Sequence, residues 1–309
     1  MKRRDFLQTT IATGLSVASV NLIPPEVRAE PFPKDPFSTD PAAKIHLTPN
    51  IVTSRIGMGT GVHGGGRQCN LTRMERDRAI RIIQFCYDNG IRFFDMADMY
   101  GSHGLVAEAL AGKPRDSYVL STKIWCRPGG LPEPERLPAD QLIERFLKEL
   151  RTDYVDMIQI HCLTDDQWET KYAYQFEPLQ RLKEKGLIRA HGVSCHSLAA
   201  AKLAAVNPWV DAMHIRLNHL GMNMDGSWDE NVAVTQTAKQ NGKGIIIMKI
   251  LGEGKMHDPE HRKTSTDAVV RLPSKDVMIV GFEKEEHVTE FLENVGASLK
   301  AMEAEQVNS

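Results

Sequence analysis

A carboxylate and a phenol follow one short apolar run of the chain. The run begins at Ile91 with residues that favour β-strands, and then changes to acidic, small and glycine residues. This change predicts a buried strand that ends at Asp95, followed by a loop that carries Tyr100. At the carboxyl end of a buried parallel strand, such a pair is suited to proton transfer. The alternative is that Asp95 caps the strand and Tyr100 packs with its hydroxyl in water.

Two later apolar segments also end in ionisable side chains. Residues 118–123 end in Lys123, and residues 155–161 end in His161. Active sites of parallel β/α barrels lie at the carboxyl ends of the strands. We therefore expect all four side chains to converge at one edge of a sheet.

These residues and their surroundings resemble the aldo-keto reductase family. The resemblance rests on Phe-Asp-x-Ala-x-x-Tyr-Gly at 94–101, Ser-Thr-Lys-x-Trp-Cys at 121–126, Ile-His at 160–161 and Gly-Val-Ser at 192–194. It covers the chain from about Lys44 to Asn294. It implies a catalytic tetrad, NADP(H) as cofactor with NAD(H) as the alternative, and reduction of an aldehyde or ketone or the reverse oxidation. The implied tetrad is Asp95, Tyr100, Lys123 and His161.

Physical requirements give each member of the tetrad a role. Hydride transfer to a carbonyl builds negative charge on oxygen, so a proton donor and a positive charge must lie beside it. A tyrosine has an ordinary pKa near ~10. A neighbouring ammonium favours the phenolate, so we expect Lys123 to lower the pKa of Tyr100 and Asp95 to hold the lysine charged. His161 would hydrogen-bond the substrate oxygen. The resemblance also places the Trp125 indole in the substrate pocket, with packing under a loop as the alternative.

The implied cofactor site departs from the family pattern. The family usually has Asn after the fifth strand, Gln on the sixth and an aromatic residue after the seventh, where this chain has Cys195, His214 and Met248. Histidine can replace part of a glutamine and methionine can lie against a ring, but cysteine is a poor hydrogen-bonding group. The predicted cofactor-binding residues are Gly59, Thr60, Asp95, Ser194, Cys195, His214, Met248, Gly252, Gly281, Lys284 and His287.

The end of the eighth strand leaves the choice between NADP(H) and NAD(H) open. A helix N-terminus that follows Gly281 is suited to bind a phosphate. Lys284 is the basic residue there, and three glutamates surround it. A second class of function therefore stays open: a binding or regulatory protein with this fold, a degenerate cofactor site and slow or absent turnover.

Strands and helices alternate along the chain from residue 56 onward. Counting predicts eight strands, each followed by a helix, which is the pattern of a (β/α)8 TIM barrel. Two short strands, at 44–47 and 51–56, predict an N-terminal hairpin that closes the bottom of the barrel, as in the family. A doubly wound sheet is the alternative fold, but no Gly-x-Gly-x-x-Gly turn opens an early helix.

The first 29 residues predict an export signal. Arg3 and Arg4 precede an apolar segment at 9–20, and Val27-Arg28-Ala29 is typical of a signal peptidase site. This order predicts a twin-arginine signal, the twin-arginine translocase as a partner, and a periplasmic protein. The proline-rich residues 30–43 predict a linker to the domain at 44–309.

Composition and charge exclude several classes of protein. With 41% hydrophobic residues, 25% charged residues and a formal net charge of −2, the chain is typical of a globular domain. It carries no charge pattern suited to bind nucleic acid or, after processing, a membrane.

The five cysteines are not spaced like a disulfide scaffold. Cys126, Cys162 and Cys195, with His196 or His214, leave open a soft metal site against the commoner role of small buried hydrophobic residues. We predict no metal. The two remaining cysteines are Cys69 and Cys86.

Overall fold

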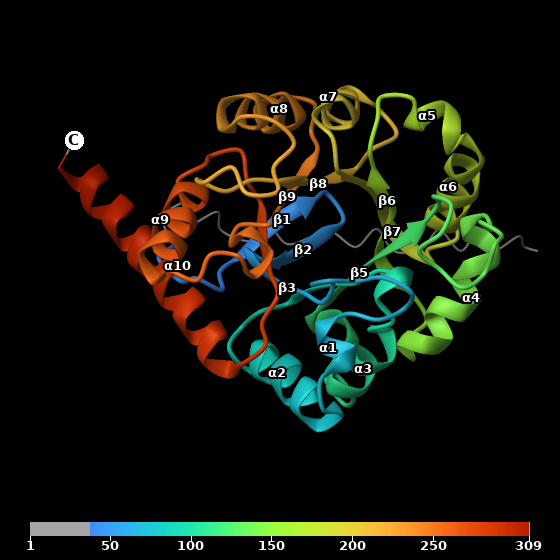
Figure 1. The fold of residues 1–309 in the computed structure, drawn as a ribbon, viewed down its shortest axis with the longest axis horizontal. Coiled ribbons are helices and arrows are strands. Elements are labelled where there is room, and N and C mark those ends of the chain that lie inside the picture. Colours follow the sequence, from blue (N-terminus) through green and yellow to red (C-terminus); the bar gives the residue numbers. More distant parts are fainter. Residues whose placement is uncertain (1–37, 309) are drawn as a thin grey trace, which may run out of the picture. The chain divides into compact units, whose positions relative to one another are not determined.

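Eight parallel strands close into a barrel within the part of the chain that the structure describes. This computed structural model describes residues 38–308. Its strand order is β10-β3-β4-β5-β6-β7-β8-β9, and helices surround the strands (Figure 1). The predicted (β/α)8 barrel is therefore confirmed. Its strands are β3 (Ile56–Gly59), β4 (Phe93–Asp95), β5 (Val119–Trp125), β6 (Val155–Leu163), β7 (Ile188–Cys195), β8 (Ala212–Arg216), β9 (Gly244–Met248) and β10 (Val277–Val280).

The predicted N-terminal hairpin is present. It pairs β1 (Lys44–Thr48) with β2 (Ile51–Ser54) in antiparallel fashion. The predicted strand at 51–56 divides at Arg55, because the Ser54 hydroxyl donates to the Ile56 carbonyl and accepts from the amide of Arg92. Leu47 and Ile51 of the hairpin join the apolar cluster inside the barrel, so the hairpin closes one end.

The helices pack outside the barrel and bury their apolar faces against it. None of the helices among residues 38–308 is both long and apolar enough to cross a membrane. The main helices are α2 (Arg76–Asp88), α3 (His103–Ala109), α4 (Ala139–Leu150), α6 (Phe176–Glu184), α7 (Leu198–Val206), α8 (Trp228–Gln240), α9 (Pro259–Val270) and α10 (Glu285–Val307), with short helices α1 (Asn70–Arg73) and α5 (Trp168–Lys171).

The last two helices have clear physical reasons for their bounds. Helix α9 begins at Pro259, because the Asp258 carboxylate caps its first turn and proline is favourable there. Helix α10 continues to Val307, and its Val295 packs into the core.

The barrel interior changes from apolar to polar toward the carboxyl ends of the strands. An apolar cluster that includes Phe93, Met157 and Ala212 fills the hairpin end. Asp95, Gln159 and His214 follow these residues two positions later, and successive side chains on one face of a strand are two residues apart. The other end of the barrel is therefore lined with buried polar groups.

The predicted signal at 1–29 and residues 30–37 of the predicted linker lie outside the described residues. The rest of the linker leads into β1 through a turn at Asp40, whose carboxylate accepts from the amide of Ala42 at 2.9 Å.

Candidate active site

A buried ion pair joins two neighbouring strands of the barrel. The Nζ of Lys123, on β5, lies 2.6 Å from both carboxylate oxygens of Asp95, on β4, and 2.9 Å from the Met96 carbonyl. Lys123 is 1% exposed and Asp95 is 4% exposed. Burial alone would raise the pKa of Asp95, but the charge of Lys123 and the nearby His214 hold it far below its usual value. Asp95 is therefore a carboxylate that holds the lysine in place.

Tyr100 and His161 meet next to this pair. The Tyr100 hydroxyl lies 3.1 Å from Nε2 of His161. Burial lowers the pKa of His161 well below its usual value, so the imidazole is neutral at neutral pH. The structure thus brings together all four residues of the predicted tetrad, with the Lys123 Nζ 5.4 Å from the centre of the Tyr100 ring.

The direction of the pKa shift of Tyr100 is opposite to the prediction. Burial raises the pKa of Tyr100 well above 10, and the Asp95 carboxylate raises it further. The prediction rested on the ammonium charge of Lys123 alone, but the Asp95 carboxylate lies 2.6 Å from the Nζ and neutralises that charge. Tyr100 is therefore a neutral phenol that can donate a proton.

Glycines hold the Tyr100 ring in place. A Cβ at Gly61 would lie 2.2 Å from the ring, and one at Gly64 would lie 2.4 Å from it. Gly101, directly after the tyrosine, has φ +65°, and a Cβ there would lie 2.1 Å from the Arg67 carbonyl oxygen. The chain before α1 therefore packs on the tyrosine so closely that only glycine fits.

A cavity of about 590 Å³ opens beside the tetrad. Asp95, Tyr100 and Lys123 lie in its wall, and the rest of the wall extends over β9, α9, β10 and α10. Its volume falls in the usual range of small-molecule sites, about 300–1,000 Å³. Of the other predicted cofactor-binding residues, those that line it are Gly59, Met248, Gly281 and His287.

The remaining predicted cofactor residues lie outside the cavity wall. Thr60 donates to the Asp95 carbonyl at 2.9 Å and pairs with the Ser102 hydroxyl at 2.7 Å, so it braces β4. Lys284 is the exposed residue that precedes α10. The other predicted cofactor residues outside the wall are Ser194, Cys195, His214 and Gly252.

His214 contacts the tetrad instead. Its Nε2 lies 3.1 Å from Oδ1 of Asp95, and the residue is fully buried. The Oγ of Ser194, the Nδ1 of His214 and the amide of Gln159 are buried and have no hydrogen-bond partner among the described residues. They lie on adjacent strands β6, β7 and β8, inside the polar end of the barrel.

Trp125 lies beside His161. The centres of the two rings are 5.3 Å apart, and the indole Nε1 donates to the Gly129 carbonyl at 2.6 Å. The side chain is mostly buried and is outside the wall of the 590 Å³ cavity. The Trp125 indole therefore packs against the His161 ring, under the loop that follows β5.

The far end of the cavity holds charged residues that the sequence reasoning missed. Nε of Arg262 on α9 lies 2.7 Å from the Glu290 carboxylate on α10, and both line the wall. Glu283 also lines it and accepts from the Asn70 amide at 2.6 Å. The Asp258-Pro259 start signal of α9 could have placed Arg262 in a first turn, but no sequence signal pairs it with Glu290.

The cysteines are all free, and four are buried. Cys162, the less buried one, has φ +63°, and its sulfur lies 3.2 Å from Nη1 of Arg127. Residues 38–308 contain no cluster of three or more histidine, cysteine or acidic side chains that could hold a metal.

Comparison with known proteins agrees with this geometry. A model of the aldo/keto reductase family matches residues 55–309. The chain belongs to the aldo/keto reductase family. Solved structures of aldo-keto reductases share its fold. The holo form of a Bacillus halodurans enzyme aligns at TM-score 0.64 and 18% identity, over 82% of this chain and 90% of that one. A Klebsiella pneumoniae enzyme in complex with NADP and acetate aligns at TM-score 0.58 and 20% identity, over 79% of this chain and 86% of that one.

Several curated relatives are named methylglyoxal reductases. Methylglyoxal reductase DkgB of Salmonella typhi is 30% identical over 188 residues, which are 59% of this chain and 65% of that protein. The NADH-specific methylglyoxal reductase of Escherichia coli is 32% identical over 192 residues, 56% and 54% of the two chains. The alignments thus span less than two thirds of these relatives.

Proposed function

We propose that the protein reduces an aldehyde or ketone with NADH or NADPH, or catalyses the reverse oxidation, with Tyr100 as general acid and base. One observation carries the proposal: the Tyr100 hydroxyl lies beside a neutral His161 and a buried Lys123–Asp95 pair, at the wall of a cavity. Membership of the aldo/keto reductase family supports an oxidoreductase.

Each residue of the tetrad has a separate task. A bound reduced nicotinamide supplies the hydride. Tyr100 donates its proton to the substrate oxygen, where negative charge develops, and its raised pKa keeps it protonated beforehand. His161 orients the same oxygen through Nε2. Lys123 supplies positive charge at a fixed place, because Asp95 and the Met96 carbonyl hold its ammonium group.

The residues beside the tetrad fit a nicotinamide cofactor. Buried polar groups normally have hydrogen-bond partners, and Ser194 Oγ and His214 Nδ1 have none among the described residues. We assign them to the carboxamide of the cofactor, which would reach Ser194 and His214 behind the cavity wall, inside the polar end of the barrel. Met248 offers an apolar surface for the ring. Gly59 and Gly281 allow close approach to the backbone, and His287 faces the far end of the cavity.

We propose small aldehydes as the first substrates to test, because several curated relatives are named for methylglyoxal. The test follows the absorbance of NADH or NADPH on addition of methylglyoxal and a panel of aldehydes, ketones and sugar derivatives. We expect carbonyl-dependent loss of the absorbance. Binding of a dinucleotide without turnover of any carbonyl would instead favour a binding or regulatory protein.

We also propose export to the periplasm by the twin-arginine translocase, on the basis of Arg3, Arg4 and the apolar segment that follows. The full chain and an Arg3→Lys, Arg4→Lys variant would be expressed in a bacterium and fractionated. We expect a processed periplasmic protein for the full chain and an unprocessed cytoplasmic protein for the variant. Unprocessed wild-type protein confined to the cytoplasm would contradict the proposal.

A further inference from the structure

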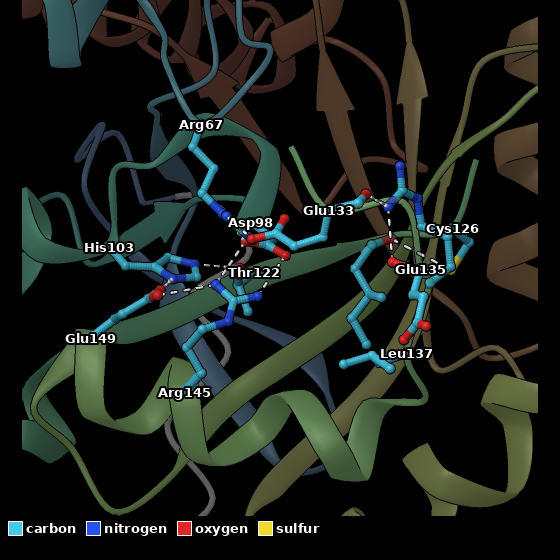
Figure 2. Close-up of polar contacts among 12 residues, drawn as sticks. Arg67, Asp98, His103, Thr122, Cys126, Glu133, Glu135, Leu137, Arg145 and Glu149 are labelled. Atoms are coloured by element: carbon cyan, nitrogen blue, oxygen red, sulfur yellow. Dashed lines mark hydrogen bonds and ion pairs between the residues drawn. The ribbon is translucent and has the colours of Figure 1, made fainter. Parts of the chain in front are cut away.

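Asp98 is a buried carboxylate held by two arginines from different elements. It begins the 3-10 turn η1 (Asp98–Tyr100) and is 3% exposed. Nε of Arg67, in the loop before α1, lies 3.0 Å from Oδ1, and Nη1 and Nη2 of Arg145, on α4, lie 2.9 and 2.7 Å from the two oxygens. Figure 2 shows Asp98 between the two guanidinium groups. Charge-assisted, two-pronged bonds of this kind fix geometry as well as adding energy.

The carboxylate is ionised. Burial alone would raise the pKa of Asp98, but the hydrogen bonds from Arg145 and Arg67 hold it below its usual value. The network therefore consists of full charges away from bulk water, where a missing partner is costly.

Arg67 joins the turn of Tyr100 to the loop between β5 and α4. Its backbone amide donates to the Met99 carbonyl at 2.9 Å, next to the tyrosine. Its Nη1 donates to Glu133, in the loop between β5 and α4, at 2.6 Å. The carbonyl of Arg67 packs tightly against Gly101, the residue that follows Tyr100. Movement of Arg67 would therefore disturb Tyr100 directly.

Arg145 anchors the network to the strand that carries Lys123. Its Nη1 also lies 3.0 Å from Glu149, whose other oxygen lies 2.7 Å from Nδ1 of His103. Nε2 of His103 lies 2.7 Å from the Thr122 hydroxyl, on β5 directly before Lys123 (Figure 2). A continuous chain of polar contacts thus connects the Tyr100 turn to the strand of the lysine.

We propose that Asp98 is a positioning residue, which acts through Arg67 and Arg145 to hold the Tyr100 hydroxyl against His161. The proposal rests on the proposed function, since it concerns the placement of the proton donor. Among the described residues, the Asp98 carboxylate pairs with Arg67 and Arg145 and makes no hydrogen bond or ion pair with Asp95, Lys123 or His161. A reacting group displaced by about 1 Å can lose roughly a hundredfold in rate, so a small shift of the turn suffices.

The chain offers a matched control at the opposite end of the barrel. Asp156, near the start of β6, is also fully buried and also lies between two arginines. Its carboxylate lies 2.7 Å from Nη2 of Arg115 and 3.1 Å from Nη1 of Arg189. Loss of its charge therefore disturbs a similar network without a contact to the Tyr100 turn.

The experiment compares Asp98→Asn with Asp156→Asn in the whole protein. We expect both variants to lower the melting temperature. We expect Asp98→Asn alone to lower kcat by about ten- to a hundredfold, with the dissociation constant of the cofactor within about twofold of wild type. Equal loss of kcat in both variants, or an unchanged kcat in Asp98→Asn, would overturn the proposal.

Crystal structures of the two variants provide a readout that does not depend on activity. We expect the distance from the Tyr100 hydroxyl to Nε2 of His161 to increase in Asp98→Asn and to stay near 3.1 Å in Asp156→Asn. If the wild type reduces no carbonyl with either cofactor, the proposed function fails, while this distance still decides the positioning role. Arg67→Gln, at a partly exposed residue, replaces Asp98→Asn if that variant does not fold, and we expect the same increase.

Discussion

The Tyr100 hydroxyl lies 3.1 Å from Nε2 of His161, and the two rings stand nearly at a right angle, 86°. The phenol lies at the wall of the cavity, and the neutral imidazole behind it is outside that wall. A substrate oxygen that lies beside both groups could accept a hydrogen bond from each side chain when the imidazole carries its proton on Nε2.

Removal of the Tyr100 hydroxyl tests the proton donor. In Tyr100→Phe we expect kcat for carbonyl reduction to fall by about 10²–10⁴, the usual contribution of a general acid. The dissociation constant of the cofactor, measured by fluorescence titration, should remain within about twofold, because the ring itself is kept. Unchanged turnover would refute the role of Tyr100.

A methyl group in the loop that packs on Tyr100 tests the placement of the ring. Gly61→Ala adds a Cβ 2.2 Å from the ring, so the tyrosine or the loop must move. We expect kcat to fall by about tenfold or more, since catalysis depends strongly on orientation. The matched control is Gly65→Ala in the same loop, where the nearest atom lies at 3.6 Å and activity should be close to wild type. Equal activities of the two variants would contradict this account.

Buried histidines make stability depend on pH below neutrality. Burial lowers the pKa of His191 to about 4 and that of His196 to about 3. In the unfolded chain both titrate near ~6.5, so the unfolded state binds more protons as the pH falls from 6.5 toward 4. The free energy of unfolding should therefore decrease in that window, by about 1.4 kcal/mol per pH unit for each histidine.

His191→Gln isolates one of these contributions. His191 lies away from the tetrad, with its ring stacked on Trp209. Denaturant titrations of wild type and variant at several pH values between 6.5 and 4 measure the slope. We expect unfolding of the variant to take up about one proton fewer than unfolding of wild type. A slope of the free energy of unfolding against pH that is identical to that of wild type would contradict the lowered pKa of His191.

The charges at the far end of the cavity predict cofactor preference. Glu290 holds Arg262 at 2.7 Å, so the guanidinium is occupied and a carboxylate lies beside it. We expect NAD(H) to bind more tightly than NADP(H), whose additional phosphate this carboxylate repels. In Glu290→Gln, the affinity for NADP(H) should increase about tenfold relative to NAD(H), because a charged arginine becomes available to a phosphate.

The same helix supplies the control for this measurement. Glu286, in the first turn of α10, is exposed and lies outside the cavity wall. Glu286→Gln makes the same change of charge, and we expect an unchanged ratio of the two dissociation constants, measured by calorimetry. A similar change of the ratio in both variants would show that general charge, and not Glu290, sets the preference.

Local patterns were sufficient for most of the fold. The alternation of strands and helices predicted the barrel, and Asp95, Lys123 and His161 lie at or near the ends of their strands. In a parallel barrel, the carboxyl ends of all strands meet on one side. Convergence of these three side chains therefore follows from strand assignment alone.

Contacts between distant segments required the folded chain. The pairing of Arg262 with Glu290 joins two helices whose mutual orientation no local pattern specifies. The contact of His214 with Asp95 crosses the barrel interior, and family resemblance assigns that position to the cofactor. Both contacts depend on how the strands and helices pack.

The sequence by itself determined which groups carry the chemistry and that they share one end of a barrel, because residue type and strand order are local properties. The tertiary structure decided how those groups are charged. The pKa of Tyr100 is raised and that of Asp95 lowered by the sum of burial and every neighbouring charge. That sum exists only after the chain has excluded water from the site.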